Sequence, residues 1–138
     1  MSAAGIQSAM DTHLSAIAGL PAVAWPGVSY TPAIGTPYVA PSMSGLDQVP
    51  VAAGADGVIR WNGTYQVSVM WSSLSAEGTA AAYAIADTIR AEFKRGLNLV
   101  TSDSMKIIVR NTAIKSPLIN MPWVHVPVVV SFWADEYP

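Results

Sequence analysis

Side chains able to carry acid–base chemistry are few in this sequence of 138 residues. The chain contains two histidines, His13 and His125, and no cysteine. A histidine acts as a general base when a carboxylate lies within hydrogen-bond reach to orient it. The candidate set for such a site is His125 with Asp103 or Glu77. Because His13 adjoins the apolar side of an expected helix and His125 stands among valines, we expect both to be structural residues.

Three further groupings have the composition of functional motifs but not their setting. Asp135 and Glu136 are adjacent near the end of the sequence, where neighbouring carboxylates are typically solvated charge. Asn62-Gly63-Thr64 matches the glycosylation sequon, yet it lies inside an expected strand. The sequence contains no HExxH, GxSxG, phosphate-loop or GxGxxG motif. We therefore expect no catalytic residue, no metal site and no cofactor, which argues against an enzyme.

The composition favours a protein that is covered by partners. Charged residues make up 12% of the chain and hydrophobic residues 51%, whereas a typical charged share is about 25%. Such a thin layer of charge is explained by burial in an assembly or by a surface rich in Ala, Ser, Thr and Gly, and we favour the assembly.

The charge gives no reason to expect nucleic-acid binding, since the formal net charge is −2. All cations lie between Arg60 and Lys115, and Arg90, Lys94 and Arg95 fall where an expected helix ends and complement its dipole. The absence of cysteine excludes disulfides and zinc-thiolate sites. The first residues lack the pattern of a signal peptide, and Val124–Trp133, the longest apolar tract, is too short to cross a bilayer. We expect a soluble, intracellular protein without membrane contacts.

Proline and glycine dominate residues 21–60, which contain six of the ten prolines. Proline fixes φ and removes a backbone donor, so this segment is predicted to be neither a helix nor a central strand but an extended, turn-broken arm. The arm is also apolar, and ordering it requires cover on its own domain or on a neighbouring chain. We favour the neighbour, and we predict that deleting 38–51 leaves a folded domain that fails to assemble. The candidates for subunit or tube contact are Trp25, Tyr30, Tyr38, Val39, Met43, Leu46 and Trp61.

Apolar periodicity predicts the elements around the arm. Ile6, Met10, Leu14 and Ile17 share one face of a helix, and alternation from Trp61 to Ser72 predicts a half-buried strand. A second helix is expected over 80–95, strands over 105–110 and 123–133, and a loop over 111–120. Pro127 should make the last strand an edge strand or give it a bulge.

These elements predict a single domain, 1–138, of the α+β class: an antiparallel or mixed sheet covered on one face by two helices, with the arm 21–60 outside it. Of the five tryptophans, Trp71 and Trp123 are expected in the core, and Trp25 and Trp61 at an interface.

The order of several segments resembles the tail terminator-like proteins of long-tailed phages. The resemblance covers nearly the whole chain and depends on the spacing of its segments. They are a short first helix, Val23-Ala24-Trp25-Pro26-Gly27-Val28, Thr31-Pro32, Gly35-Thr36-Pro37-Tyr38-Val39, Gly63-Thr64-Tyr65-Gln66-Val67-Ser68-Val69, an alanine-rich helix ending in Ala91-Glu92-Phe93, and Val126-Pro127-Val128-Val129-Val130.

What the resemblance implies is a structural protein of the virion. Such a subunit would form a closed ring, a hexamer by expectation, that caps the tail tube, stops its polymerisation and meets the head-tail connector. The genome would pass through the ring without direct nucleic-acid binding by the protein. The alternatives are a neck, head-completion or tail-tube subunit, or a monomeric small-molecule-binding domain with the prolines as a lid.

Overall fold

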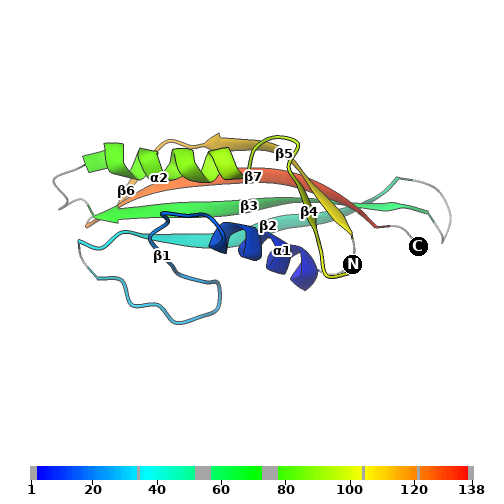
Figure 1. Cartoon of the computed structure of the whole chain (residues 1–138), viewed down its shortest axis with the longest axis horizontal. Coiled ribbons are helices and arrows are strands. Elements are labelled where there is room, and N and C mark those ends of the chain that lie inside the picture. Colours follow the sequence, from blue (N-terminus) through cyan, green and yellow to red (C-terminus); the bar gives the residue numbers. More distant parts are fainter. Residues whose placement is uncertain are drawn as a thin grey trace.

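The computed structural model describes residues 3–33, 35–51, 57–72, 78–103, 105–120 and 122–136. Two helices and seven strands lie within these ranges (Figure 1). In chain order they are α1 (Ala3–Ser15), β1 (Ala22–Val23), β2 (Tyr38–Pro50), β3 (Ile59–Ser72), α2 (Gly78–Glu92), β4 (Asn98–Val100), β5 (Lys106–Ile114), β6 (Leu118–Asn120) and β7 (Trp123–Glu136).

The strands form one curled sheet in the order β1-β2-β3-β7-β5-β4, with β6 beside β7. β1 and β2 run parallel, and the other pairs are antiparallel. β3 and β7 pair from Ile59 with Glu136 to Ser72 with Trp123 without a register shift. The α+β class and the mixed sheet are therefore confirmed.

The predicted alternation of β3 is confirmed, and it defines two faces of the sheet. On the first, the core face, β3 and β7 bury Trp61, Gly63, Tyr65, Val67, Val69, Trp71, Val124, Val126, Val128, Val130, Phe132 and Ala134. The other face, called the second face here, carries mostly half-buried side chains, among them Asn62, Gln66, Met70, His125 and Trp133. Because the side-chain period of a strand is two, a slip by one residue would expose the whole core set.

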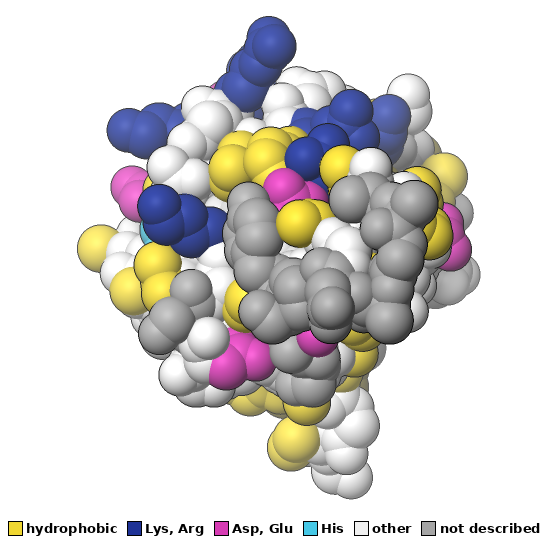
Figure 2. Space-filling view, turned by 90° about the vertical axis from the view of Figure 1, so that its right-hand side faces the viewer, with side chains coloured by type: hydrophobic (Ala, Val, Ile, Leu, Met, Phe, Trp, Pro, Cys, Tyr) yellow, Lys and Arg dark blue, Asp and Glu magenta, His cyan; other side chains and the backbone are white. Residues whose placement is uncertain are grey.

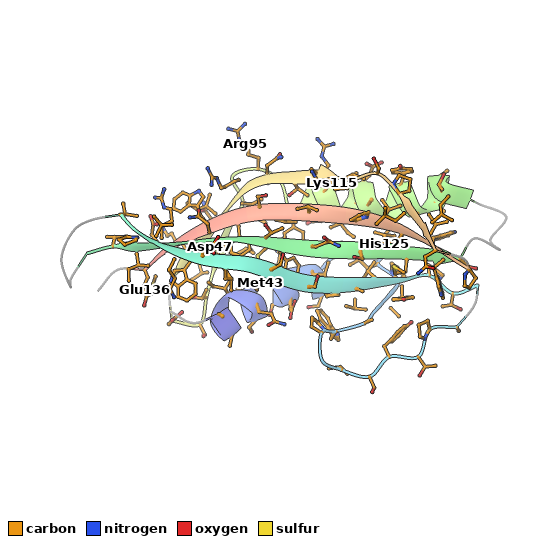
Figure 3. All side chains as sticks on the ribbon, turned by 180° about the vertical axis from the view of Figure 1, so that it is seen from behind. Met43, Asp47, Arg95, Lys115, His125 and Glu136 are labelled. Carbon is orange, nitrogen blue, oxygen red and sulfur yellow. The ribbon has the colours of Figure 1, made fainter. Side chains whose placement is uncertain are left out.

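The helices add their predicted apolar stripes to the same core. α1 buries Ile6, Met10 and Leu14, and α2 buries Ala82, Ala86 and Ile89. Figure 1 shows both helices in front of the sheet, and in Figure 3, seen from behind, the strands pass in front of them. Within the described residues, neither helix is long and apolar enough to cross a membrane.

Tyr65 of β3 joins the two helices to the sheet. Its hydroxyl donates a hydrogen bond to Asp11 of α1 at 2.5 Å, and its ring lies 6.0 Å from that of Phe93, directly after α2. Burial first, and the bond to Asp11 second, raise the pKa of the Tyr65 hydroxyl. His13 of α1 donates from Nε2 to the carbonyl oxygen of Glu92 at 2.8 Å. The first histidine therefore joins α1 to the end of α2.

The prediction of an arm outside the sheet was wrong for residues 38–50. These residues form β2, which pairs with β3 along its length, while β1 covers only Tyr38 and Val39 on the other side. β2 therefore lies near the edge of the sheet, and along most of its outer side no described strand pairs with it. This position explains how the strand includes Pro41 and Pro50, which cannot donate to a ladder. Residue 34 and residues 52–56 of the expected arm lie outside the described residues.

A β-bulge interrupts β2 at Gly45. Ser44 pairs with Thr64 and Asp47 with Asn62, so Gly45 and Leu46 together oppose Gly63. Gly45 has a φ of 65°, a conformation that glycine adopts without strain. The extra residue turns Leu46 toward the core face, against Gly63. A Cβ at Gly63 would lie 2.8 Å from Leu46 Cδ2 and 2.7 Å from Phe132 Cζ.

The predictions for Pro127 and for 111–120 were also wrong. β7 is a central strand, and Pro127 pairs with Ser68 in unbroken register. The Lys115 N–H donates to the Pro127 carbonyl at 2.9 Å. The backbone nitrogen of Pro127 points to the same side of β7 as this carbonyl, into the gap between the end of β5 and the start of β6. No described strand pairs with β7 there, so the absent N–H leaves no hydrogen bond unmade. Residues 111–114 and 118–120 extend the sheet in place of the expected loop.

Candidate interaction surface

An aromatic cluster joins three separate parts of the chain at one end of the second face. The ring of Tyr30, from the irregular segment before β2, lies 4.9 Å from that of Tyr38. The Tyr38 ring meets Trp123 of β7 edge-on, at 5.2 Å and 82°. Burial first, and the neighbouring Tyr30 second, raise the pKa of the Tyr38 hydroxyl. The cluster therefore presents neutral, ring-rich surface to a partner.

Strand register extends this cluster across the sheet. Tyr38 pairs with Met70, Met70 with His125, and His125 with Leu118 of β6, so the four residues form one row. Leu118 is 56% exposed, whereas Ile119, 73% exposed, pairs with Val124 and therefore points to the opposite side of the sheet. We call this region the aromatic end of the second face. Its apolar side chains at the surface suit contact with another protein.

His125 is the histidine within this row. Burial of its ring lowers the pKa of His125 below the ordinary value. Its Nε2 atom is buried and makes no hydrogen bond with any residue that the structure describes. Figure 3 shows the labelled side chain on β7. The folded protein therefore favours the neutral imidazole.

We expect the stability of the protein to fall as the pH drops through this titration. The folded pKa lies below the unfolded one, so the unfolded chain binds more protons below about pH 6.5. The urea midpoint of the wild type should decrease between pH 7.5 and pH 5.5. A His125→Gln variant should lose less over the same range, and an equal loss in both proteins would assign the effect to other groups.

The opposite end of the sheet is held by polar contacts between β3 and β7. Arg60 donates to Asp135 from Nε at 2.8 Å and from Nη2 at 3.0 Å, and its guanidinium lies 4.2 Å from the centre of the Trp133 ring. The indole N–H of Trp61 donates to Glu136 at 2.9 Å, and this bond is the main cause that lowers the Glu136 pKa. The carboxylates expected to be solvated thus fix the ends of two strands.

Three of the candidate contact residues lie at least partly at the surface. Tyr30 and Tyr38 belong to the aromatic end. Trp25 is half-buried, and with Pro26 and four α1 residues it lines a shallow hollow of about 270 Å³. The structure therefore brings Tyr30 and Tyr38 together but places Trp25 apart, beside α1.

The other four candidates pack against the core of the chain, two of them buried and two half-buried. Val39 is fully buried and Trp61 only 9% exposed. Met43 and Leu46 are half-buried against the core. Val39 therefore has no surface to offer a neighbouring chain, because β2 places it over its own core. Val39 and Trp61 are therefore covered within the chain, whereas Val28, Val49 and Val51 of the predicted arm remain exposed.

Two residues of the aromatic end, Trp123 and Leu118, and the exposed Ile119 next to Leu118 were not among the candidates. Trp123 was expected in the core but lies half-buried beside Tyr38. Leu118 and Ile119 fell in a predicted loop and instead form β6. Their signal in the sequence is weak, since two apolar residues between Pro117 and Asn120 do not establish a period.

The structure does not assemble the expected acid–base set. Asp103 lies just before β5 and accepts a hydrogen bond from Thr101, whereas His125 lies near the start of β7. Ile107 pairs with Ala134, nine residues from His125 along β7, which corresponds to roughly 30 Å. Glu77 lies outside the described residues. Among the residues that are described, no three His, Asp or Glu side chains gather as a metal site.

Comparison with known proteins gives a family and a fold. The model of the phage tail terminator protein family matches residues 5–132. One solved chain is similar with a TM-score of 0.69 and 21% identity, over 100% of this chain and 99% of its own length. A chain from the virion of a native gene transfer agent (GTA) particle gives a TM-score of 0.63 and 21% identity, over 97% of both chains. No curated protein matches the chain at a significant level.

The two solved structures show the fold alone, because their identity is low. The family match is stronger evidence of what the protein is, since it covers nearly all of the sequence. The resemblance described in the sequence analysis covers nearly the same residues. The family match supports a structural role in a phage tail. The chain belongs to the phage tail terminator protein family.

Proposed function

We propose that this chain is a single-domain subunit of a ring that caps the tail tube of a long-tailed phage. In this role it stops polymerisation of the tube and offers its other side to the head-tail connector. The family match over residues 5–132 is the observation that carries the proposal. The ring, a hexamer in the simplest form, joins the virion at the neck end of the tail after assembly in the host cytoplasm.

The distribution of covered and uncovered surface supports this role. In the proposed subunit both helices cover the core face, and the second face with its aromatic end is left for partners. Tyr30, Tyr38 and Trp123 are close enough to form one contact patch, and Leu118 extends it with exposed apolar surface. A head-to-tail contact made by such a patch closes into a ring when its rotation permits. We retain Trp25, Met43 and Leu46 as secondary contact positions and assign Val39 and Trp61 to internal support.

Electron microscopy of the purified full-length chain, alone and with its tail-tube protein, tests the proposal. We expect discrete rings or, where the ring closes only on the tube, shorter tubes with capped ends. Long tubes formed by the chain alone would instead identify a tube subunit. A chain that stays monomeric in light scattering and leaves tube length unchanged would overturn the proposal.

A further inference from the structure

Positive charge gathers along one edge of this subunit. Six of the seven cations are exposed and lie on or beside α2 and β5: Arg90, Lys94, Arg95, Lys106, Arg110 and Lys115. Residues 87–115 contain these six cations and three acids, whereas the rest of the chain contains one cation and six acids. We call this region the cationic edge. The net charge of −2 therefore hides a strong separation of charge.

The cations of this edge are not neutralised within the subunit. Arg60 pairs with Asp135, but none of the six forms an ion pair with a residue that the structure describes. Asp87 is the acid that shares the edge most closely, because it lines the same hollow as Arg90. The positive potential is thus available to an outside partner.

The helix dipole explains only half of the set. Arg90, Lys94 and Arg95 lie at the C-terminal end of α2, where cations are favoured. Lys106, Arg110 and Lys115 lie on or directly after β5, and Arg110 stands at a register shift in that strand. A helix end gives no reason for cations on a neighbouring strand, so the set has a further cause.

A hollow on this edge has a volume of about 360 Å³ and is lined by residues of α2, of the segment directly after α2 and of β5, so that it adjoins Arg90, Lys94 and Arg95 but not the three cations on and after β5. Its lining residues are Asp87, Arg90, Ala91, Phe93, Lys94, Arg95, Asn111 and Thr112. Figure 3 shows Arg95 and Lys115 projecting from the same edge, and Figure 2 shows most of the Lys and Arg side chains in the upper part of the face viewed.

The chemistry of the cationic edge fits a phosphate backbone better than a protein surface. Protein interfaces are depleted in Lys and have an apolar centre. None of the large apolar side chains found exposed in the described residues lies on α2 or β5. Exposed Lys and Arg beside the exposed Asn111 are the kind of groups that contact DNA phosphates without reading sequence. We propose that the cationic edge binds the phosphate backbone of DNA.

This proposed contact goes beyond the capping role and departs from the expectation of no direct nucleic-acid binding. Its location in a virion depends on the proposed function, since the genome would pass the ring. The binding itself does not, and it can be measured on the purified chain. Failure of one proposal therefore leaves the other standing.

Fluorescence anisotropy with a labelled 20-base-pair duplex tests the binding. We expect binding of unrelated sequences with equal affinity, and a loss of about 100-fold between 50 and 200 mM salt if about four phosphates are contacted. Lys106→Gln with Arg110→Gln should weaken binding at least tenfold at 50 mM salt and lower the salt slope by about two. Circular dichroism should show an unchanged fold, because both side chains are exposed.

A charge-matched variant separates this edge from net charge. Ser44→Glu with Gln48→Glu makes the same change in charge on exposed positions of β2, and it should weaken binding less than threefold. An equal loss in both variants, or no binding at 50 mM salt, would overturn the proposal. Displacement of DNA by polyglutamate at equal charge concentration would also overturn it, because the edge would then suit an acidic protein.

Discussion

Deletion of residues 38–51 is expected to prevent folding. The sequence alone predicted a folded remainder, but the structure gives β2 a full ladder with β3 and places Val39 in the core. Its loss would leave the backbone groups of β3 that pair with β2 without partners and remove Leu46 from Gly63. Native domains have a net stability of only about 5–15 kcal/mol, which the loss of a strand exceeds. Circular dichroism and urea titration of the deletion variant should show no cooperative transition.

A matched pair of substitutions tests the same point at single residues. Val39→Asp places a carboxylate at a fully buried position and should cost several kcal/mol of folding free energy. Val49→Asp changes the same strand where the side chain is 47% exposed, and it should change stability by at most about 0.5 kcal/mol. If the deletion variant unfolded cooperatively, or if the two substitutions had equal effects, residues 38–51 would be an arm outside the folded domain.

Gly63→Val is expected to destabilise the protein by about 3 kcal/mol or more. The new Cβ would lie within 2.8 Å of both Phe132 and Leu46, and overpacking of a core costs typically about 1–3 kcal/mol, with larger values for bigger insertions. The intrinsic preference of a strand for valine over glycine acts in the opposite direction. The sign of the measured change in unfolding free energy therefore decides whether packing or local preference controls this position.

Two variants serve as controls for Gly63. Thr64→Val makes a similar change on the second face, where the neighbouring side chain is half-buried, and it should have a small effect. Phe132→Leu combined with Gly63→Ala should show a favourable coupling in a double-mutant cycle, because the ring atom nearest the new Cβ is removed. If the two changes were additive, the contact with Phe132 would not be the cause.

Elements with a clear period could be predicted from the sequence. β3 alternates over its whole length, and α1 and α2 carry stripes that match the buried residues found. β2 could not be predicted, because its prolines and Gly45 are signals of irregular chain. Those residues are tolerated since the strand lies near an edge and has a bulge. The sequence shows where the prolines are, but it does not show which side of the strand has no neighbouring strand to pair with.

The contact surface was predicted less well than the fold. Tyr30 and Tyr38 were proposed as contacts because they lie in an apolar, proline- and glycine-rich segment that needs cover, and the structure places their rings together. Trp123 and Leu118 were missed, because their place beside Tyr38 depends on pairing between β6, β7 and β3. The cationic edge was missed for the same reason, since Lys106 and Arg110 are distant in sequence from Arg90.

The interruptions of β2 also bear on how an unassembled copy behaves. Bare strand edges invite stacking into fibrils when many identical chains are crowded together. Pro41, Gly45, Asp47 and Pro50 break the outer side of this strand at intervals, so a second copy finds no continuous row of backbone donors and acceptors. The residues that make this strand hard to predict from the sequence therefore also protect an unassembled copy from amyloid-like aggregation.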